Sequence, residues 1–195
     1  MATMGRPREF DTEKALDKAL DVFWRNGYEG TSISELTQAM GISPPSLYAA
    51  FGNKEKLFHS ALDRYAEVRK QVWAELMKQP TARAMMERLF ARIIEFYATD
   101  SNPNCCMLVK LSTGACDHVL GEHLRAKRAE AEAMLLERFT KARTDGELPD
   151  DVEPGDLAGY FMTVLDGLSV RAAAGATAEE LHKVAHLAMR SWPEK

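Results

Sequence analysis

Among the side chains with hydroxyl or ammonium groups between residues 31 and 54, five are candidates to donate hydrogen bonds to phosphate. They are Thr31, Ser43, Ser46, Tyr48 and Lys54. Groups of this kind contact nucleic-acid phosphates and so position a protein on a duplex. The alternatives are a helix cap for Thr31, a core position for Tyr48 and a solvated surface position for Lys54. For Tyr48 we expect the phosphate contact, because Leu47 and Phe51 already supply the inner face of its helix.

Apolar residues lie among these donors, and they limit how bases could be read. Pro44, Pro45 and Ala49 can offer only apolar contacts, such as those with thymine methyl groups. Arg, Asn and Gln, the side chains that read bases through two hydrogen bonds, are missing from this face. Reading through DNA shape is therefore expected, helped by Arg6 and Arg8 in an arm that could enter a minor groove. A frayed terminus is the alternative for the arm.

Cys105 and Cys106 follow Asn104 at the expected start of another helix. A thiolate in the first turn of a helix is stabilised by the free backbone N–H groups there. Lys110 adds a positive charge one turn further on. A disulfide between adjacent cysteines is not expected, because it would be strained. Cys106 is a candidate redox or electrophile sensor, and the alternative is that both thiols are small buried hydrophobic groups.

The remaining candidates for chemistry are weak. His182 and His186 have i, i+4 spacing, but no third ligand lies nearby in the sequence. No Ser/His/Asp set, phosphate-binding loop or placed carboxylate pair is evident. We therefore expect no metal, no cofactor and no enzymatic activity.

The phosphate-binding candidates require a particular pair of helices. Ser32 and Glu35 have capping-box spacing, and Ile33, Leu36, Thr37 and Met40 form one apolar helical face. Gly41 can end that helix, and Ser43 can cap the next one, with prolines tolerated at its first positions. Two short helices joined by a turn of about four residues with glycine predict a helix-turn-helix.

The rest of the chain also has helical periodicity and no strand pattern, so we expect an all-α protein of about nine helices. A helical domain with its N-terminal arm is expected at 1–56, and a larger helical bundle at 57–195, with the boundary inside one long helix. Besides the pair described above, helices are expected from Asp11 or Thr12 to Gly27, from residue 54 to about 78, from 82 to the break at 99–104, from Cys105 or Cys106 to about Cys116, and over 120–143, 155–174 and 178–192.

Composition favours a soluble globular protein of the cytoplasm. The chain has 195 residues, with 46% hydrophobic and 28% charged, and an odd number of cysteines. Neither an apolar signal-peptide core nor an apolar run of about 18 residues occurs, so no membrane contact is expected. The net charge is −4, which argues against nonspecific coating of nucleic acid.

Apolar side chains on the later helices suggest two further surfaces. One group combines methionine with aromatic residues, which suits a pocket for varied ligands, although core packing is the alternative for each residue. The other group gives the last two helices excess apolar surface, which predicts a four-helix interface between two copies. The pocket candidates are Met86, Phe90, Phe96, Tyr97, Met107, Leu111, Phe139 and Phe161, and the interface candidates are Phe161, Leu165, Leu168, Val184 and Leu187.

The stretch from Gly27 to Leu57 resembles the DNA-binding core of the tetracycline-repressor (TetR) family. The resemblance rests on Gly27-Tyr28, Gly30-Thr31, Gly41-Ile42-Ser43, Leu47-Tyr48, Phe51 and Lys54-Glu55-Lys56-Leu57, and the Pro44-Pro45 pair departs from it. It implies a homodimeric repressor that binds a palindromic operator in double-stranded DNA and is released by a small-molecule effector. The segment from Cys106 to Lys110 also resembles a subgroup in which some members sense electrophiles through that cysteine. The alternative function is a helical ligand-binding or thiol-based enzyme with an incidental helix-turn-helix.

Overall fold

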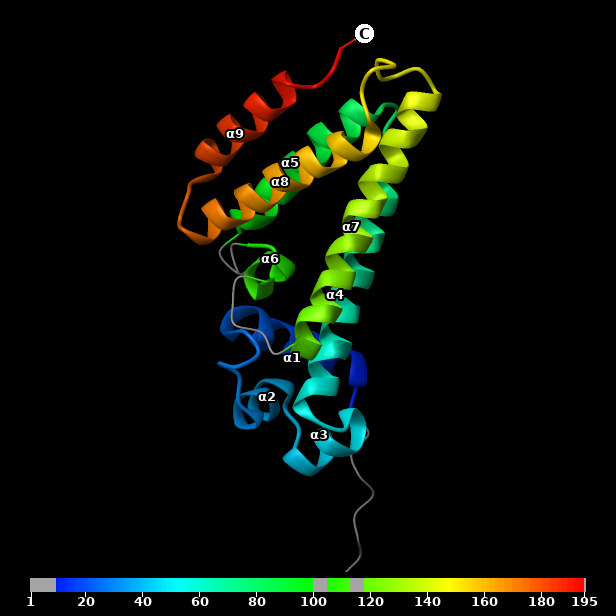
Figure 1. Ribbon diagram of the computed structural model, residues 1–195. Coiled ribbons are helices and arrows are strands. Elements are labelled where there is room, and N and C mark those ends of the chain that lie inside the picture. The colour runs from blue at the N-terminus through cyan, green and yellow to red at the C-terminus, as the bar shows by residue number, and fades with distance from the viewer. Residues whose placement is uncertain (1–9, 100–104, 113–117, 195) are drawn as a thin grey trace, which may run out of the picture. The chain divides into compact units, whose positions relative to one another are not determined.

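The computed structural model describes residues 10–99, 105–112 and 118–194, and within these ranges every regular element is an α-helix (Figure 1). The chain divides into two compact units, the first ending at Glu67 and the second beginning at Val68. None of the described helices is both long and apolar enough to cross a bilayer. The helices are α1 (Thr12–Asn26), α2 (Ile33–Met40), α3 (Pro44–Phe51), α4 (Lys54–Leu76), α5 (Ala82–Tyr97), α6 (Met107–Ser112), α7 (His118–Thr144), α8 (Pro154–Ala173) and α9 (Ala178–Arg190).

The first unit is built around a small aromatic core. The rings of Phe23 in α1 and Phe58 in α4 are fully buried and meet edge to face, with their centroids 5.1 Å apart. Leu36 of α2 and Leu47 of α3 are buried as well. Asp17 of α1 accepts a hydrogen bond of 2.8 Å from Arg64 of α4. The start of α4 is therefore part of the packing that holds the two short helices.

This packing explains where the first unit ends. The sequence placed the boundary between residues 56 and 57, whereas the compact units divide between Glu67 and Val68. Both positions lie inside α4. The difference arises because Leu57, Ala61 and Tyr65 are buried within the first unit, as are the other apolar residues at this end of α4.

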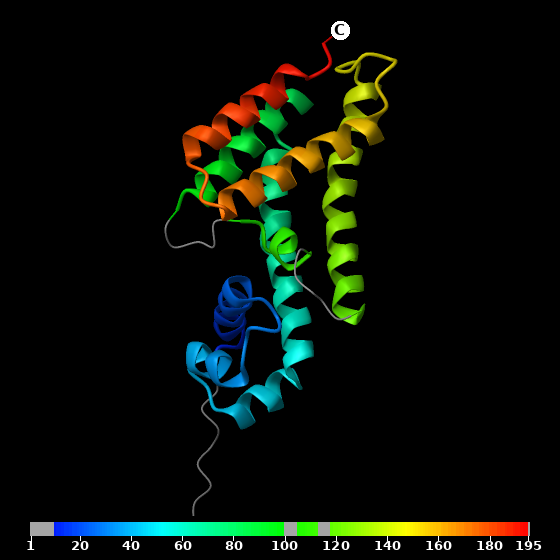
Figure 2. The same ribbon diagram turned by 60° about the vertical axis from the view of Figure 1, so that its left-hand side comes forward.

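The second unit is a bundle in which α5, α8 and α9 pack together and α7 packs along α8 (Figure 2). Its core contains an aromatic cluster: the Phe161 ring lies 6.0 Å from Phe90 and from Phe139, and 5.5 Å from Trp192, between centroids. Because α5, α7 and α8 each supply one of the three phenylalanines, this cluster joins the bundle at its centre.

Most predicted helix ends are confirmed because capping residues mark them. Asp11, Thr81 and Thr177 cap α1, α5 and α9 through hydrogen bonds from backbone N–H groups in the first turn. The helix expected from residue 105 is the exception. It begins at Met107, and its described part ends at Ser112, so Cys105 and Cys106 precede the helix rather than occupy its first turn.

Candidate functional site

The turn between α2 and α3 is fixed by side-chain caps at both of its ends. Ser32 and Glu35 form the predicted capping box, and the hydrogen bonds from Ser32 lower the pKa of the Glu35 carboxyl. Gly41 ends α2 with φ of 68°, which is a left-handed conformation that favours glycine. Ser43 then caps α3 by accepting a hydrogen bond from the backbone N–H of Ser46. The predicted helix-turn-helix is confirmed.

Thr31 has a different local role from the predicted cap. Ser32 is the residue that caps α2, whereas the Thr31 hydroxyl donates a hydrogen bond of 2.6 Å to the carbonyl of Gly27. Thr31 is 2% exposed. Its side chain therefore fixes the chain between α1 and α2, and a phosphate contact through its hydroxyl would require that bond to be shared or broken.

The outer face of α3 carries most of the predicted DNA-contacting residues. The Tyr48 side chain is 49% exposed, and Pro44, Pro45 and Ala49 are exposed beside it. On the inner side, Leu47 is fully buried. Phe51, which was predicted to point inward, is half-buried, because α3 is only eight residues long and Leu47 alone reaches the centre of the core.

The hydroxyl groups at the start of α3 form a pair. The Oγ atoms of Ser43 and Ser46 lie 2.9 Å apart, and either of them can be the donor. Pro44 and Pro45 have no backbone N–H, and the N–H of Ser46 is taken by the cap, so these two hydroxyls supply the hydrogen-bond donors at this end of the helix.

Lys54 begins α4 and is held by an aromatic ring. Its ammonium lies 4.3 Å from the centroid of the Tyr28 ring, a distance at which the face of the ring attracts a cation. Asn53 caps the same helix end by accepting a hydrogen bond of 2.7 Å from the backbone N–H of Lys56. The Lys54 charge therefore lies at a helix N-terminus that itself favours anions. Arg6 and Arg8 lie outside the described residues.

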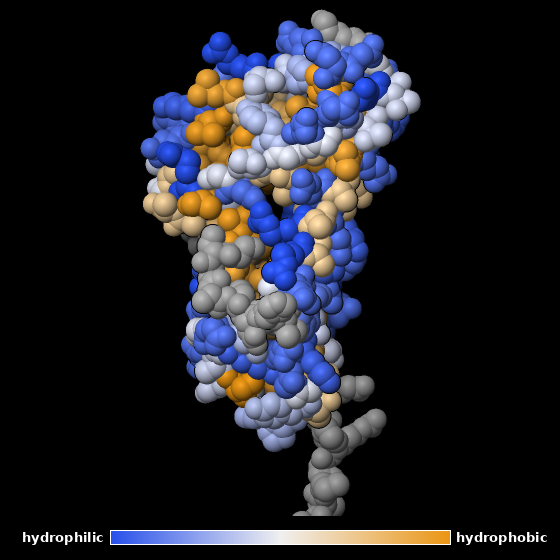
Figure 3. Space-filling view, viewed as in Figure 1, coloured by the Kyte–Doolittle hydropathy of each residue, from blue (hydrophilic) through white to orange (hydrophobic). Residues whose placement is uncertain are grey.

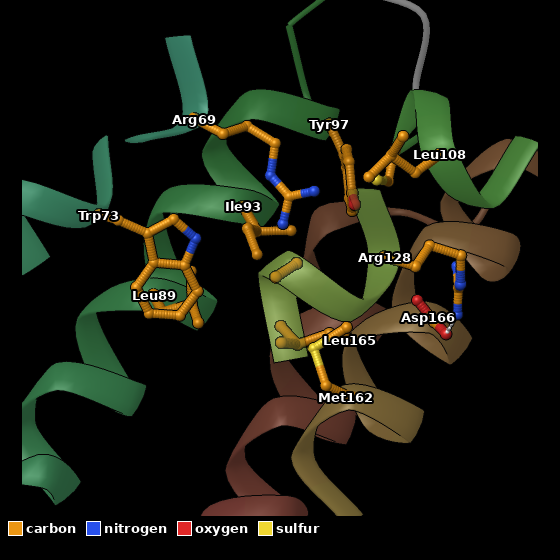
Figure 4. Close-up of a pocket in the computed structure, with 12 residues that line it drawn as sticks. Arg69, Trp73, Leu89, Ile93, Tyr97, Leu108, Arg128, Met162, Leu165 and Asp166 are labelled. Atoms are coloured by element: carbon orange, nitrogen blue, oxygen red, sulfur yellow. Dashed lines mark hydrogen bonds and ion pairs between the residues drawn. The ribbon is translucent and has the colours of Figure 1, made fainter. Parts of the chain in front are cut away.

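A cavity of about 50 Å³ opens in the second unit, bordered by residues of α4, α5, α6, α7 and α8 and by Cys106, which precedes α6 (Figure 4). At roughly 10–15 Å³ for each enclosed water, this is space for about four water-sized groups. Its walls are mainly apolar. The lining residues are Arg69, Trp73, Leu89, Ile93, Tyr97, Cys106, Leu108, Arg128, Ala131, Met162, Leu165 and Asp166.

Polar groups enter this cavity from several helices. Arg128 of α7 forms an ion pair with Asp166 of α8, and Figure 4 shows the Arg69 and Tyr97 side chains directed into the same space. Burial raises the pKa of Tyr97, and the charge of a Cys106 thiolate raises it further. A hydrogen bond with Ser169 opposes these effects but does not cancel them.

The comparisons with known proteins agree on one family. Residues 15–61 match the family described as bacterial regulatory proteins, tetR family. The chain is 33% identical to the HTH-type transcriptional repressor ComR of Escherichia coli (strain K12), over 97% of this chain and 92% of ComR. A cysteine mutant of the TetR family transcriptional regulator CifR, solved with 26bp double-strand operator DNA, is 38% identical with a TM-score of 0.91, covering 97% of this chain and 100% of that one. The chain belongs to the tetR family of bacterial regulatory proteins.

It is therefore a DNA-binding transcriptional regulator, as the resemblance implied. Another relative of this tetR-family chain is the HTH-type transcriptional repressor BdcR of Escherichia coli (strain K12), 28% identical over 94% of this chain and 90% of BdcR. Both bacterial relatives are described as repressors.

The predicted pocket residues of this tetR-family chain are mostly in its core. Tyr97 borders the cavity, and so does Cys106, the predicted sensor. The others do not line it: Phe96 is an exposed residue of α5, and the rest are buried. They have the same periodicity as the lining residues but point to the interior of the bundle. The buried candidates are Met86, Phe90, Met107, Leu111, Phe139 and Phe161.

Sequence reasoning missed the charged residues of the cavity, although a signal for them exists. Arg128 falls on the apolar stripe of α7 that includes Leu124, Ala131 and Leu135. In α4, Arg69 likewise has the helical spacing of two buried apolar residues, Trp73 and Leu76. A charged residue at an apolar position of a helix points toward the interior, which indicates a partner or a cavity there.

The predicted interface residues of α8 and α9 fall into two groups. Phe161 and Leu168 are fully buried within one copy, so they have no surface to offer a second copy. Leu165 and Val184 are half-buried, and Leu187 is 61% exposed. Sequence reasoning missed two exposed apolar residues of α8, Tyr160 and Val170. Figure 3 shows hydrophobic surface over α8 and α9.

Proposed function

We propose that this chain is a cytoplasmic repressor that binds a palindromic operator as a homodimer and leaves the DNA when a small molecule enters the cavity of its second unit. The observation that carries the DNA part is the exposed outer face of α3, which follows a rigidly capped turn and projects Tyr48, Pro44 and Pro45. The operator complex of CifR, which is 38% identical, supports it.

The chemistry of this surface favours phosphate positioning over direct base reading. Tyr48, Lys54 and the Ser43–Ser46 hydroxyl pair can donate to phosphate oxygens, which carry no base information. Pro44, Pro45 and Ala49 can only pack against apolar base atoms such as thymine methyls. We therefore expect an operator whose sequence is read in part through its shape, with Arg6 and Arg8 reaching a minor groove.

Dimerisation follows from the length of DNA that one helix can read. A single recognition helix covers one half-site, and two copies bind half-sites one helical turn apart. The exposed apolar residues Tyr160, Val170 and Leu187 give α8 and α9 a surface for the second copy. Gly167 helps, because a Cβ added there would meet nothing within 4 Å. This leaves room for a facing helix to approach closely.

The cavity supports a role for Cys106 in effector sensing. Cys106 lines the cavity that we propose admits the effector. Helix α6 begins directly after Cys106, so an attached group larger than this cavity of about 50 Å³ would have to displace α6 or its neighbours. We propose Cys106 as the sensing thiol on this basis rather than on the helix N-terminus expected from sequence.

Operator binding is the experiment that tests the proposed function. A labelled duplex carrying the palindrome upstream of the protein's own reading frame is titrated with the protein, with a scrambled duplex as control. We expect dimer binding at least about 10³-fold tighter to the palindrome than to the scrambled DNA. Equal affinity for both duplexes would contradict the repressor and favour a helical enzyme or ligand-binding protein with an incidental helix-turn-helix.

A further inference from the structure

The charged side chains that line the cavity carry an excess of positive charge. Arg69 of α4 and Arg128 of α7 both line it, and both are half-buried. Among the described residues of the lining, Asp166 of α8 is the sole carboxylate, and it forms an ion pair with Arg128. That pair is neutral as a whole, so the positive charge of Arg69 is the excess charge of this lining.

The guanidinium of Arg69 is placed where a ligand would meet it. Arg69 and Trp73 are one turn apart on α4, so their side chains lie on the same face of the helix. Figure 4 shows the Arg69 side chain directed into the cavity. A guanidinium has several N–H donors in a planar fork, so a contact with one protein group leaves donors for a ligand.

Tyr97 supplies a second hydrogen-bond donor in the same space. Burial raises the pKa of Tyr97, and the positive charge of Arg69 acts against that rise without cancelling it, so the phenol keeps its proton at neutral pH. The phenol hydrogen bonds with Ser169, which is fully buried and also accepts a hydrogen bond of 2.7 Å from the backbone N–H of Cys106. Tyr97 is therefore a neutral hydroxyl in a fixed position that the charge of Arg69 reaches.

These groups favour an anion over other small molecules. A cation would be repelled by the excess positive charge, and a neutral apolar molecule would take water from the guanidinium without replacing its hydrogen bonds. A carboxylate replaces them, because its two oxygens match the fork of an arginine side chain. Arg69 offers that fork, and the Tyr97 hydroxyl can donate to the same carboxylate.

The size and walls of the cavity limit the rest of the ligand. A space of about 50 Å³ admits roughly four or five non-hydrogen atoms, which is the size of acetate or propionate. Leu89, Ile93 and Met162 give the cavity apolar walls, which suit a short hydrocarbon chain and leave a second charged group without a partner.

We propose that the cavity selects small aliphatic monocarboxylates, with Arg69 as the residue that binds the carboxylate and Tyr97 as a second donor to it. This inference rests on the proposed role of the cavity in effector binding. It goes further by naming the chemical class of the effector and the residue that discriminates for it.

A charged and a neutral probe of the same shape test the selection. Propionate and propionamide have equal numbers of non-hydrogen atoms, and only propionate is an anion. Each is titrated into the full-length wild type by calorimetry, with sodium chloride keeping the ionic strength equal. Because molecules of this size bind weakly, the titrations extend into the millimolar range. We expect propionate to bind at least about 10-fold more tightly, the lower range for a hydrogen bond between charged groups.

Arg69→Gln separates recognition of the charge from support of the fold. Glutamine keeps a polar side chain that can donate hydrogen bonds but removes the positive charge. We expect it to weaken propionate binding at least about 10-fold and to leave propionamide binding nearly unchanged. Arg92→Gln is the matched control, since Arg92 is an exposed residue of α5 outside the lining. It should keep the wild-type preference for propionate.

The outcomes separate this inference from the proposal on which it rests. No propionate binding, equal binding of both probes by the wild type, or unchanged propionate binding by Arg69→Gln would overturn the inference, and the operator titration would still decide the repressor. The probe comparison needs the wild type alone, so a poorly folded variant leaves it decisive. Propionate is also added to the operator complex at constant ionic strength. Binding that depends on Arg69 without release of the operator would uphold the carboxylate site and contradict the cavity's proposed role in release.

Discussion

At the residue scale, Lys54 is positioned for a phosphate before any DNA arrives. Its ammonium lies over the Tyr28 ring, which lowers the entropy that would be lost on ordering a free lysine. We expect Lys54→Ala to weaken binding to operator and scrambled DNA by similar factors and to reduce the slope of log affinity against log salt by about 1. Fluorescence anisotropy at several salt concentrations measures both quantities.

The matched control for that substitution is Lys18→Ala. Lys18 is an exposed lysine of α1 in the same unit and is not among the predicted contacts. It should leave the salt slope unchanged. If Lys54→Ala and Lys18→Ala both give the wild-type slope of log affinity against log salt, the prediction that Lys54 contacts phosphate is wrong.

The second prediction at the residue scale concerns modification of the Cys106 thiol. N-ethylmaleimide attached to this thiol adds more atoms than the adjoining cavity of about 50 Å³ accommodates, so the surrounding helices must move. We expect the treated wild type to lose operator binding and Cys106→Ser to retain it after the same treatment. The Cys105→Ser variant is the control and should respond as the wild type does. Equal loss in the wild type and in Cys106→Ser would make Cys106 a packing residue.

At the element scale, a buried ion pair joins α7 to the start of α5. Arg138 of α7 is 4% exposed, and its guanidinium donates to the Glu147 carboxylate, which also accepts a hydrogen bond from the backbone N–H of Ala82. Glu147→Ala would leave Arg138 charged and buried without this partner. Breaking a buried pair from one side costs about 3–5 kcal/mol. We expect the free energy of unfolding to fall by about 3 kcal/mol, measured with urea.

A more exposed pair between the end of α7 and the N-cap of α8 provides the comparison. Arg143 donates a hydrogen bond of 2.9 Å to Glu153, and their side chains are 36% and 65% exposed. Solvated pairs contribute at most about 1 kcal/mol, so Glu153→Ala should change the free energy of unfolding by less than that. A similar loss in the two variants would mean that burial of Arg138 does not set the cost.

The elements also show what a sequence can and cannot reveal. Helix ends at Gly41, Ser43 and Thr81 were predictable because caps and left-handed glycines act over a few residues. The helical faces of the core were predictable from periodicity. The cavity was not, because Phe139 and Tyr97 have the same apolar spacing and differ only in what other helices place beside them. The late start of α6 had no local signal: Cys105 and Cys106 are compatible with a helix.

At the scale of the whole molecule, dimerisation combines two helix-turn-helix units, each with moderate affinity for DNA, into one protein that binds its operator specifically. The chain has a net charge of −4 and only a few cationic contacts on its DNA-binding surface, so nonspecific attraction is weak. One copy would read a half-site with a face that lacks Arg, Asn and Gln. Two copies multiply the affinity for paired half-sites without new contact chemistry. Loss of the dimer should therefore cost more operator affinity than loss of any single phosphate contact.

A substitution in the proposed interface on α8 and α9 tests whether operator binding depends on the dimer. Val170 is 51% exposed within one copy and lies one turn from Gly167, so Val170→Arg leaves the core of the copy intact. It would bury an unpaired charge between two copies, which costs several kcal/mol. We expect sedimentation velocity to show monomers and operator binding to be lost. Met77→Arg, at an exposed position that follows α4, should remain dimeric. A dimeric Val170→Arg variant with unchanged operator affinity would place the interface elsewhere. An arginine that faces solvent changes neither dimerisation nor DNA binding.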